Sequence, residues 1–265
     1  MSDDSMTGDS AADLALKVRN SLRKSGYPLE LRVVAAFEEA GASYSDHSRY
    51  YGDPSSGKVR EIDVVACWRK RASFAYLVAE CKSKPCPWVV FSSSWVEDPA
   101  DLLQLFHTWE FYDEPRLQDL VANEDFRAAS TLLQPIRIGT SIVEVRFGKE
   151  NDPDPNRRDS AFDAVRAAMS AVEGFRNDVD EEAMRDLESV SVVALPVAVT
   201  SGALFRGWLD HRGDIAVEET DLAFVSVRLG LDTTPKVCAV TTEKGLPGLA
   251  KQARRTARAL ARPAN

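Results

Sequence analysis

Two carboxylates and a lysine within residues 59–84, VREIDVVACWRKRASFAYLVAECKSK, have the types and spacing that metal-dependent hydrolysis requires. Asp63 precedes one apolar run, and Glu80 ends a second run with Lys82 two positions further on. Carboxylate oxygens are ligands that a hard divalent cation prefers. An ammonium group beside such a cation can neutralise charge that develops on a phosphate. The three side chains are therefore the first candidates for a functional site.

The apolar runs predict the elements that would position these residues. Residues 64–68 indicate a buried strand and residues 75–79 its antiparallel neighbour, with a basic turn at 69–73. Side chains alternate along a strand, so Glu80 and Lys82 should share one face while Cys81 takes the other. We therefore expect Asp63 to meet this pair near the end of the hairpin.

A structural explanation competes with the chemical one. A Glu-x-Lys triplet arises by chance about once in a chain of this length, and Glu80 could simply form an ion pair with Lys82 or Arg60. Its position favours a bound cation, because it follows five consecutive apolar residues, 75–79, where an unpaired carboxylate is costly to desolvate.

A helix is predicted at residues 28–40, PLELRVVAAFEEA, with proline in its first turn. Val33, Val34 and Phe37 follow Glu30 at intervals of three, four and seven residues, which places Glu30 in the apolar stripe of this helix. Glu30 is thus a fourth candidate. Its alternative role is to interact with the helix dipole as a first-turn carboxylate.

With these features the chain resembles the restriction-endonuclease-like, or PD-(D/E)xK, nuclease superfamily over about residues 27–91. The acidic positions of the family map onto Asp63 and Glu80, and its lysine maps onto Lys82. Ile62 stands where the family name has a proline. Many members also carry a glutamate on the preceding helix, which Glu30 matches.

The resemblance implies an α/β fold with a mixed β-sheet core flanked by α-helices. It further implies that Asp63, Glu80 and the backbone carbonyl of Cys81 hold Mg²⁺ or Mn²⁺, which would polarise a scissile phosphate and acidify its bound water. Lys82 would orient that water. The implied partner is nucleic acid, with DNA favoured over RNA. The resemblance leaves open whether the protein forms a homodimer. The alternative is a catalytically silent domain of this fold that binds nucleic acid or a protein.

Composition sets the wider limits. The chain has 265 residues, 44% hydrophobic and 28% charged, as in soluble globular proteins. We expect an acidic, disordered segment at 1–12 and one domain at 13–262, cytoplasmic and without membrane contact. A net charge of −8 argues against coating nucleic acid by bulk electrostatics but permits a local basic groove. The four cysteines lack zinc-ligand spacing and are expected as buried thiols.

The rest of the chain is predicted more coarsely. A helical insertion is expected at 99–134 and a C-terminal half at 136–262, with strands at 190–199, 203–209, 223–229 and 237–241. The first helix of that half should bury Phe162, Val165, Met169, Val172 and Phe175. Aromatic residues of the insertion, including Phe106 and Trp109, are expected in the core rather than stacked on bases. The last helix should bury Leu249, Ala253, Ala257 and Leu260, and exposes Arg254, Arg258 and Arg262 as a basic stripe.

Motifs for other chemistries are absent from the sequence. It contains no Walker or Rossmann glycine pattern, no G-x-S-x-G and no H-E-x-x-H. NTPase, dinucleotide-dependent and serine-hydrolase activities are therefore disfavoured, and the nuclease and the silent domain are the two hypotheses that remain.

Overall fold

The computed structural model describes residues 10–54, 56–96, 104–111, 126, 129–130, 132, 136–147, 159–179, 190–229 and 234–261. Its helices are α1 (Ala11–Lys24), α2 (Tyr27–Glu39), α6 (Ser160–Val179) and α7 (Leu246–Leu260). Its strands are β1 (Tyr44–Gly52), β2 (Val59–Lys70), β3 (Ser73–Lys82), β4 (Trp88–Val96), β5 (His107–Phe111), β6 (Ile136–Glu144), β7 (Val190–Thr200), β8 (Leu204–Leu209), β9 (Ile215–Glu219), β10 (Leu222–Val227) and β11 (Lys236–Thr242). The chain is thus mixed α/β, as predicted.

The strands form one mixed sheet in the order β1-β2-β3-β7-β11-β10-β6-β4-β8-β9. β1, β2 and β3 are antiparallel neighbours, whereas β3, β7 and β11 run parallel. β5 pairs antiparallel with the first half of β7. The predicted hairpin is therefore confirmed, and it joins the rest of the sheet through β3.

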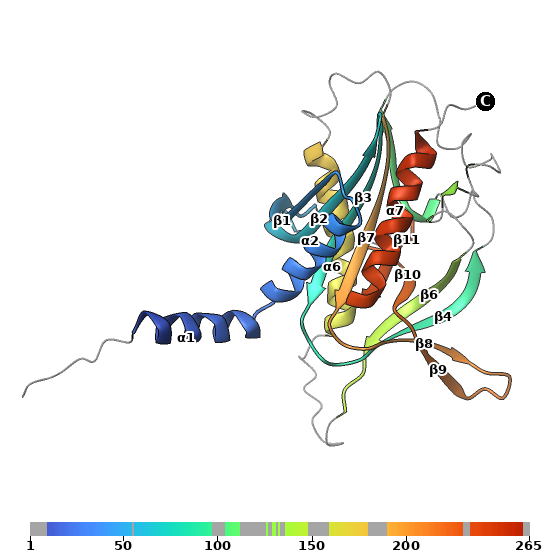
Figure 1. Ribbon diagram of the computed structural model, residues 1–265. Coiled ribbons are helices and arrows are strands. Elements are labelled where there is room, and N and C mark those ends of the chain that lie inside the picture. Colours follow the sequence, from blue (N-terminus) through green and yellow to red (C-terminus); the bar gives the residue numbers. More distant parts are fainter. Residues whose placement is uncertain are drawn as a thin grey trace, which may run out of the picture.

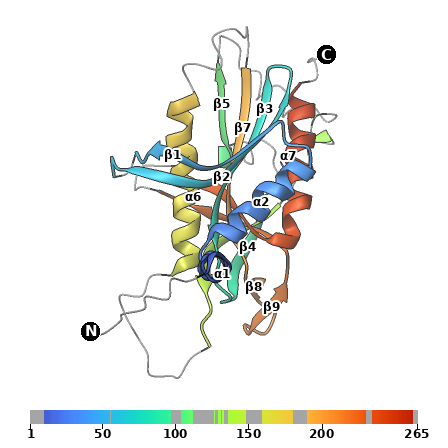
Figure 2. The ribbon, with the colours of Figure 1, turned by 60° about the vertical axis from the view of Figure 1, so that its left-hand side comes forward.

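Helices cover both faces of the sheet. α2 and α7 lie on one face and α6 on the other, an arrangement that the two views show together (Figures 1 and 2). The β8 and β9 hairpin and helix α1 extend away from this body (Figure 1). Within the part of the chain that is described, no helix is both long and apolar enough to cross a membrane.

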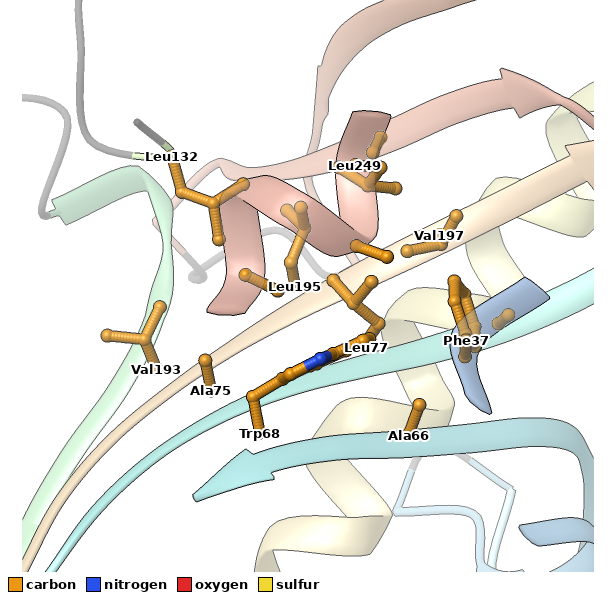
Figure 3. Packing of buried hydrophobic residues seen from close by; sticks show 14 of the residues in the cluster. Phe37, Ala66, Trp68, Ala75, Leu77, Leu132, Val193, Leu195, Val197 and Leu249 are labelled. Carbon is orange, nitrogen blue, oxygen red and sulfur yellow. The ribbon is translucent and has the colours of Figure 1, made fainter. Parts of the chain in front are cut away.

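The core beneath α2 and α7 is built from alternate residues of the central strands (Figure 3). Trp68 of β2 and Leu77 of β3 point into it beside Leu195 of β7. The ring of Phe37 from α2 meets Trp68 edge to face, with centroids 5.7 Å apart. This packing fixes α2 over the hairpin and so sets the position of Glu30 at its start.

Several sequence predictions need correction. Residues 107–111, expected as helical insertion, form strand β5, because β-formers such as Thr108 and Trp109 find an open partner in β7. Most of the remaining insertion lies outside the described residues. Phe162 was expected in the core but is 38% exposed, and Ala161 is buried in its place. The other four residues of that predicted stripe are buried, as are the inward residues predicted for α7.

The remaining predictions concern aromatic residues, the cysteines and the two ends of the chain. Phe106 and Trp109 are buried, which confirms their packing role. All four cysteines are free thiols, and only Cys86 is not fully buried. Residues 1–9 and Arg262 lie outside the described residues, while α1 begins at Ala11 behind the capping residue Ser10.

Candidate metal and phosphate site

The site forms where strands β2 and β3 part. Their paired register ends at Val64 and Ala79, so Asp63 and Glu80 are the first residues beyond it. Before this point in the chain, residues 59–62 of β2 pair with β1. Beyond it, residues 80–82 of β3 pair with β7. The fork leaves polar backbone groups of β3 without a ladder partner on the β2 side.

Asp63 fills this fork. Its Oδ2 accepts a hydrogen bond of 2.6 Å from the backbone N–H of Cys81. In an antiparallel strand the N–H and C=O of one residue point to the same side, so the Cys81 carbonyl is also directed toward β2. The carboxylate and the carbonyl that the sequence named as ligands therefore face the same gap.

Glu80 and Lys82 share a face of β3, as predicted. The Lys82 ammonium donates to Glu80 Oε1 at 2.6 Å, and the two side chains are 31% and 13% exposed, respectively. Cys81 packs into the core on the opposite face. Of the two structural ion pairs considered for Glu80, the one with Lys82 is therefore present. Arg60 instead pairs with Asp53.

The electrostatics show that this ion pair leaves the carboxylates poorly compensated. Burial, followed by the charge of Asp63, raises the pKa of Glu80 to about 7 despite the contact with Lys82. Burial also raises the pKa of Asp63, an effect that the Cys81 N–H only partly offsets. The pKa of Lys82 is raised, because Glu80 and Asp63 outweigh the lowering effect of burial. Such an excess of buried negative charge favours a bound cation.

Glu30 lies at the edge of this group. Leu29, Val33 and Phe37 are the buried residues of α2, so Glu30 is on the flank of the apolar stripe rather than in its middle, which corrects the sequence prediction. Burial and the charge of Asp63 raise the pKa of Glu30, so the two carboxylates interact. No side chain caps the start of α2.

A pocket of about 280 Å³ adjoins the fork on the α6 side of the sheet. Glu80 and Lys82 form one wall. The other lining residues come from distant parts of the chain: Asp53, Arg60, Asp163, Arg166, Ala167, Ser170 and Leu229. Asp63 is not among them, so the pocket opens beside the fork rather than within it.

Sequence reasoning missed most of these residues. Asp53 is 1% exposed although it follows β1 in a segment that reads as a turn-rich loop. It accepts hydrogen bonds from Ser56 at 2.6 Å and Ser170 at 2.7 Å. Its turn residues gave no signal of burial, because the partner hydroxyl lies 117 residues away on α6.

The donor set suits a hard cation. Asp63, Glu80 and the Cys81 carbonyl offer only oxygen, which Mg²⁺ and Mn²⁺ accept, and Mg²⁺ commonly binds through one or two carboxylates with water completing its shell. In the described ranges no three His, Cys, Asp or Glu side chains are grouped to hold a metal. The fit therefore rests on two carboxylates and one carbonyl.

Comparison with known proteins gives no relative from which to transfer a function. No protein-family model, curated protein or solved structure matches the chain.

Proposed function

We propose that the protein is a metal-dependent nuclease of the restriction-endonuclease-like class that hydrolyses phosphodiester bonds, in DNA rather than RNA. The observation that carries the proposal is the fork between β2 and β3. There the Asp63 carboxylate accepts from Cys81, directly between Glu80 and Lys82. The surrounding mixed sheet with helices on both faces is of the kind that this resemblance implies.

Each group in the fork has a defined task in this proposal. Asp63, Glu80 and the Cys81 carbonyl would hold Mg²⁺ or Mn²⁺. When bound, the cation would withdraw charge from the scissile phosphate and lower the pKa of a coordinated water. Lys82 exchanges its contact with Glu80 for the attacking water and the phosphate oxygens, and stabilises the charge that develops there. Glu30 adds negative charge behind Asp63.

The alternative is a catalytically silent domain in which Glu80 and Lys82 are a structural ion pair. Their 2.6 Å contact is compatible with both functions. We favour the nuclease because Glu80 is buried near the charge of Asp63, and a bound cation would relieve the repulsion between these two carboxylates.

Calorimetry with Mn²⁺ separates the two. The wild-type protein should bind Mn²⁺, while Asp63→Asn and Glu80→Gln should each abolish binding and remain folded. Glu39→Gln is the control, since it removes an exposed carboxylate at the end of α2. Its affinity should stay within about threefold of wild type, as a purely long-range charge effect predicts. Absence of Mn²⁺ binding by the wild type, or unfolding of both site variants, would support the ion-pair alternative.

A further inference from the structure

The pocket beside the fork combines cations with an apolar wall. Arg60 from β2 and Arg166 from α6 line it together with Lys82. Ala167 and Leu229 add the apolar surface. Phosphate recognition requires the first kind of group, and packing against a sugar or base requires the second.

Arg60 is held in place by a buried carboxylate. Its Nε lies 2.6 Å from Oδ2 of Asp53. Asp53 is 1% exposed and is anchored by Ser56 and Ser170, which tie it to the loop after β1 and to α6. The Arg60 side chain as a whole is 51% exposed. A half-exposed cation held by a buried partner is oriented before any ligand arrives.

An aromatic ring lies next to the second arginine, at Phe162, which is not itself a lining residue of the pocket. The guanidinium carbon of Arg166 is 6.0 Å from the ring centroid of Phe162, one turn earlier on α6. Phe162 is 38% exposed, although the pattern of the helix predicts it in the core. An exposed aromatic beside a phosphate-binding cation is a surface on which an unpaired base can stack.

The net charge of the lining residues does not by itself account for nucleic-acid binding by the pocket. Its three cations are matched by the carboxylates of Asp53, Glu80 and Asp163, so the lining has no formal excess of positive charge. Tight binding of a duplex backbone depends on such an excess. Shape, stacking and the guanidinium groups of Arg60 and Arg166 remain as the sources of recognition.

We infer that this pocket binds one unpaired nucleotide of single-stranded DNA, with its phosphate at Arg60 and Arg166 and its base toward Phe162. Its volume of about 280 Å³ is near the lower limit of small-ligand pockets. It therefore suits a single nucleotide displaced from a duplex rather than a base pair. The inference rests on the proposed function for the choice of DNA and for the position of the bound nucleotide beside the bond to be cut at Lys82.

The first test measures binding of thymidine 5′-monophosphate by NMR titration in EDTA, so that no metal ion contributes to the affinity. The wild type should bind it at least fivefold more tightly than thymidine and than inorganic phosphate. Arg166→Gln should weaken binding at least fivefold. Arg212→Gln removes an exposed arginine in the turn between β8 and β9, and should change affinity less than twofold.

A substitution that fills the pocket tests whether nucleotide binding depends on the cavity or only on surface charge. Ala167→Phe keeps every charged group while occupying the space beside Ala167, so it should abolish nucleotide binding. Thermal unfolding checks that the variant is folded. If it is not, Ala167→Leu replaces it, with an expected loss of at least fivefold. Unchanged affinity in a folded filled variant would overturn the inference.

The second test compares a fluorescent single-stranded oligonucleotide with its duplex by anisotropy in EDTA. The single strand should bind at least tenfold more tightly, and Phe162→Ala should weaken it at least fivefold, the lower range of one base stacked on an aromatic ring. Phe147→Ala is the control, since Phe147 is 87% exposed, whereas Phe162 lies 6.0 Å from the lining residue Arg166. Equal affinity for both forms of DNA would overturn the inference.

The two proposals fail in different ways. Nucleotide binding that requires the pocket, in a protein that cuts no DNA with Mn²⁺, would refute the nuclease and leave the nucleotide pocket standing. Cleavage of DNA by a protein that binds thymidine monophosphate no better than thymidine would do the reverse.

Discussion

The carboxylate of Asp63 accepts a 2.6 Å hydrogen bond from the backbone N–H of Cys81, the residue between Glu80 and Lys82. This bond replaces a rung of the ladder at the point where β2 and β3 diverge. It holds the acid of one strand against the Glu-x-Lys triplet of the other. Asp63 therefore contributes both to stability and to the proposed metal site, and different substitutions at this position can separate the two contributions.

Asp63→Asn and Asp63→Leu should differ in stability. Asparagine can still accept from the Cys81 N–H and carries no buried charge, so its melting temperature should equal or exceed that of the wild type in EDTA. Leucine leaves that N–H without a partner at a cost of about 1–3 kcal/mol. Thermal unfolding of the two variants measures the difference. Equal destabilisation by both would contradict the assigned hydrogen bond.

The pKa of Glu80 predicts a pH-dependent stability. Because burial raises it from 4.5 to about 7, the contribution of this group is fully present below about pH 4.5 and is lost as the pH rises through 7. As the pH rises from 5 to 8, Glu80→Gln should therefore lose less stability than the wild type, because glutamine has no group that must ionise in the buried site. Urea unfolding in EDTA at both pH values tests this.

Protonation of Glu80 should also affect the affinity for metal ions. Since a cation displaces the proton from Glu80, Mn²⁺ affinity should rise with pH through about 7. Calorimetry at pH 6 in two buffers of different ionisation enthalpy should detect release of close to one proton, and less at pH 8. A proton count that does not vary with pH would show that Glu80 is not a ligand.

Glu30→Gln should have an intermediate effect. Glu30 interacts with Asp63 through charge, as the raised pKa of Glu30 shows, but lies on the flank of α2. Its loss should weaken Mn²⁺ binding several-fold without abolishing it, as expected for a charge that does not itself coordinate the ion. Loss as complete as in Asp63→Asn would make Glu30 a ligand.

Asp53→Ala should destabilise the fold. The substitution leaves Ser170 and Arg60 without their buried partner, and the expected loss is about 2–4 kcal/mol of unfolding free energy. Asp163→Ala, which removes a less buried carboxylate of the same pocket, should cost under about 1 kcal/mol. Urea denaturation compares them. Similar losses would show that Asp53 has no special structural role.

The hairpin that carries the site was predictable because its signal is local. Two apolar runs and a basic turn specify β2 and β3, and strict alternation then places Glu80 and Lys82 on one face. The alternation also explains why Cys81 is in the core. The fork itself was not predictable, since it depends on β1 and β7 drawing the two strands apart.

Strands with weaker signals were missed because pairing decides their state. β1 is largely polar and β9 largely exposed, and each lies at an edge of the sheet. β6 contains Gly139, where an added Cβ would lie 2.4 Å from Val90 of the neighbouring β4. A glycine that reads as a strand breaker is thus required by close packing between strands.

Helix α6 shows a different limit. Its buried stripe centres on alanines such as Ala161 and Ala168, which carry little weight in a pattern read from large apolar residues. Phe162 falls at the edge of that stripe and is exposed. The pocket was beyond sequence reasoning, because Asp53, Lys82 and Arg166 are brought together only by the tertiary fold.

Cleavage by the Lys82→Ala variant tests the nuclease proposal most directly. With Mn²⁺ and a labelled single-stranded oligonucleotide under single-turnover conditions, the wild type should cut and Asp63→Asn should not. Lys82→Ala should keep Mn²⁺ binding and most of its DNA affinity while losing about a hundredfold or more in rate, the scale of one electrostatic group acting on a transition state. A wild-type protein that binds DNA and Mn²⁺ yet cuts neither single-stranded nor duplex DNA would contradict the account.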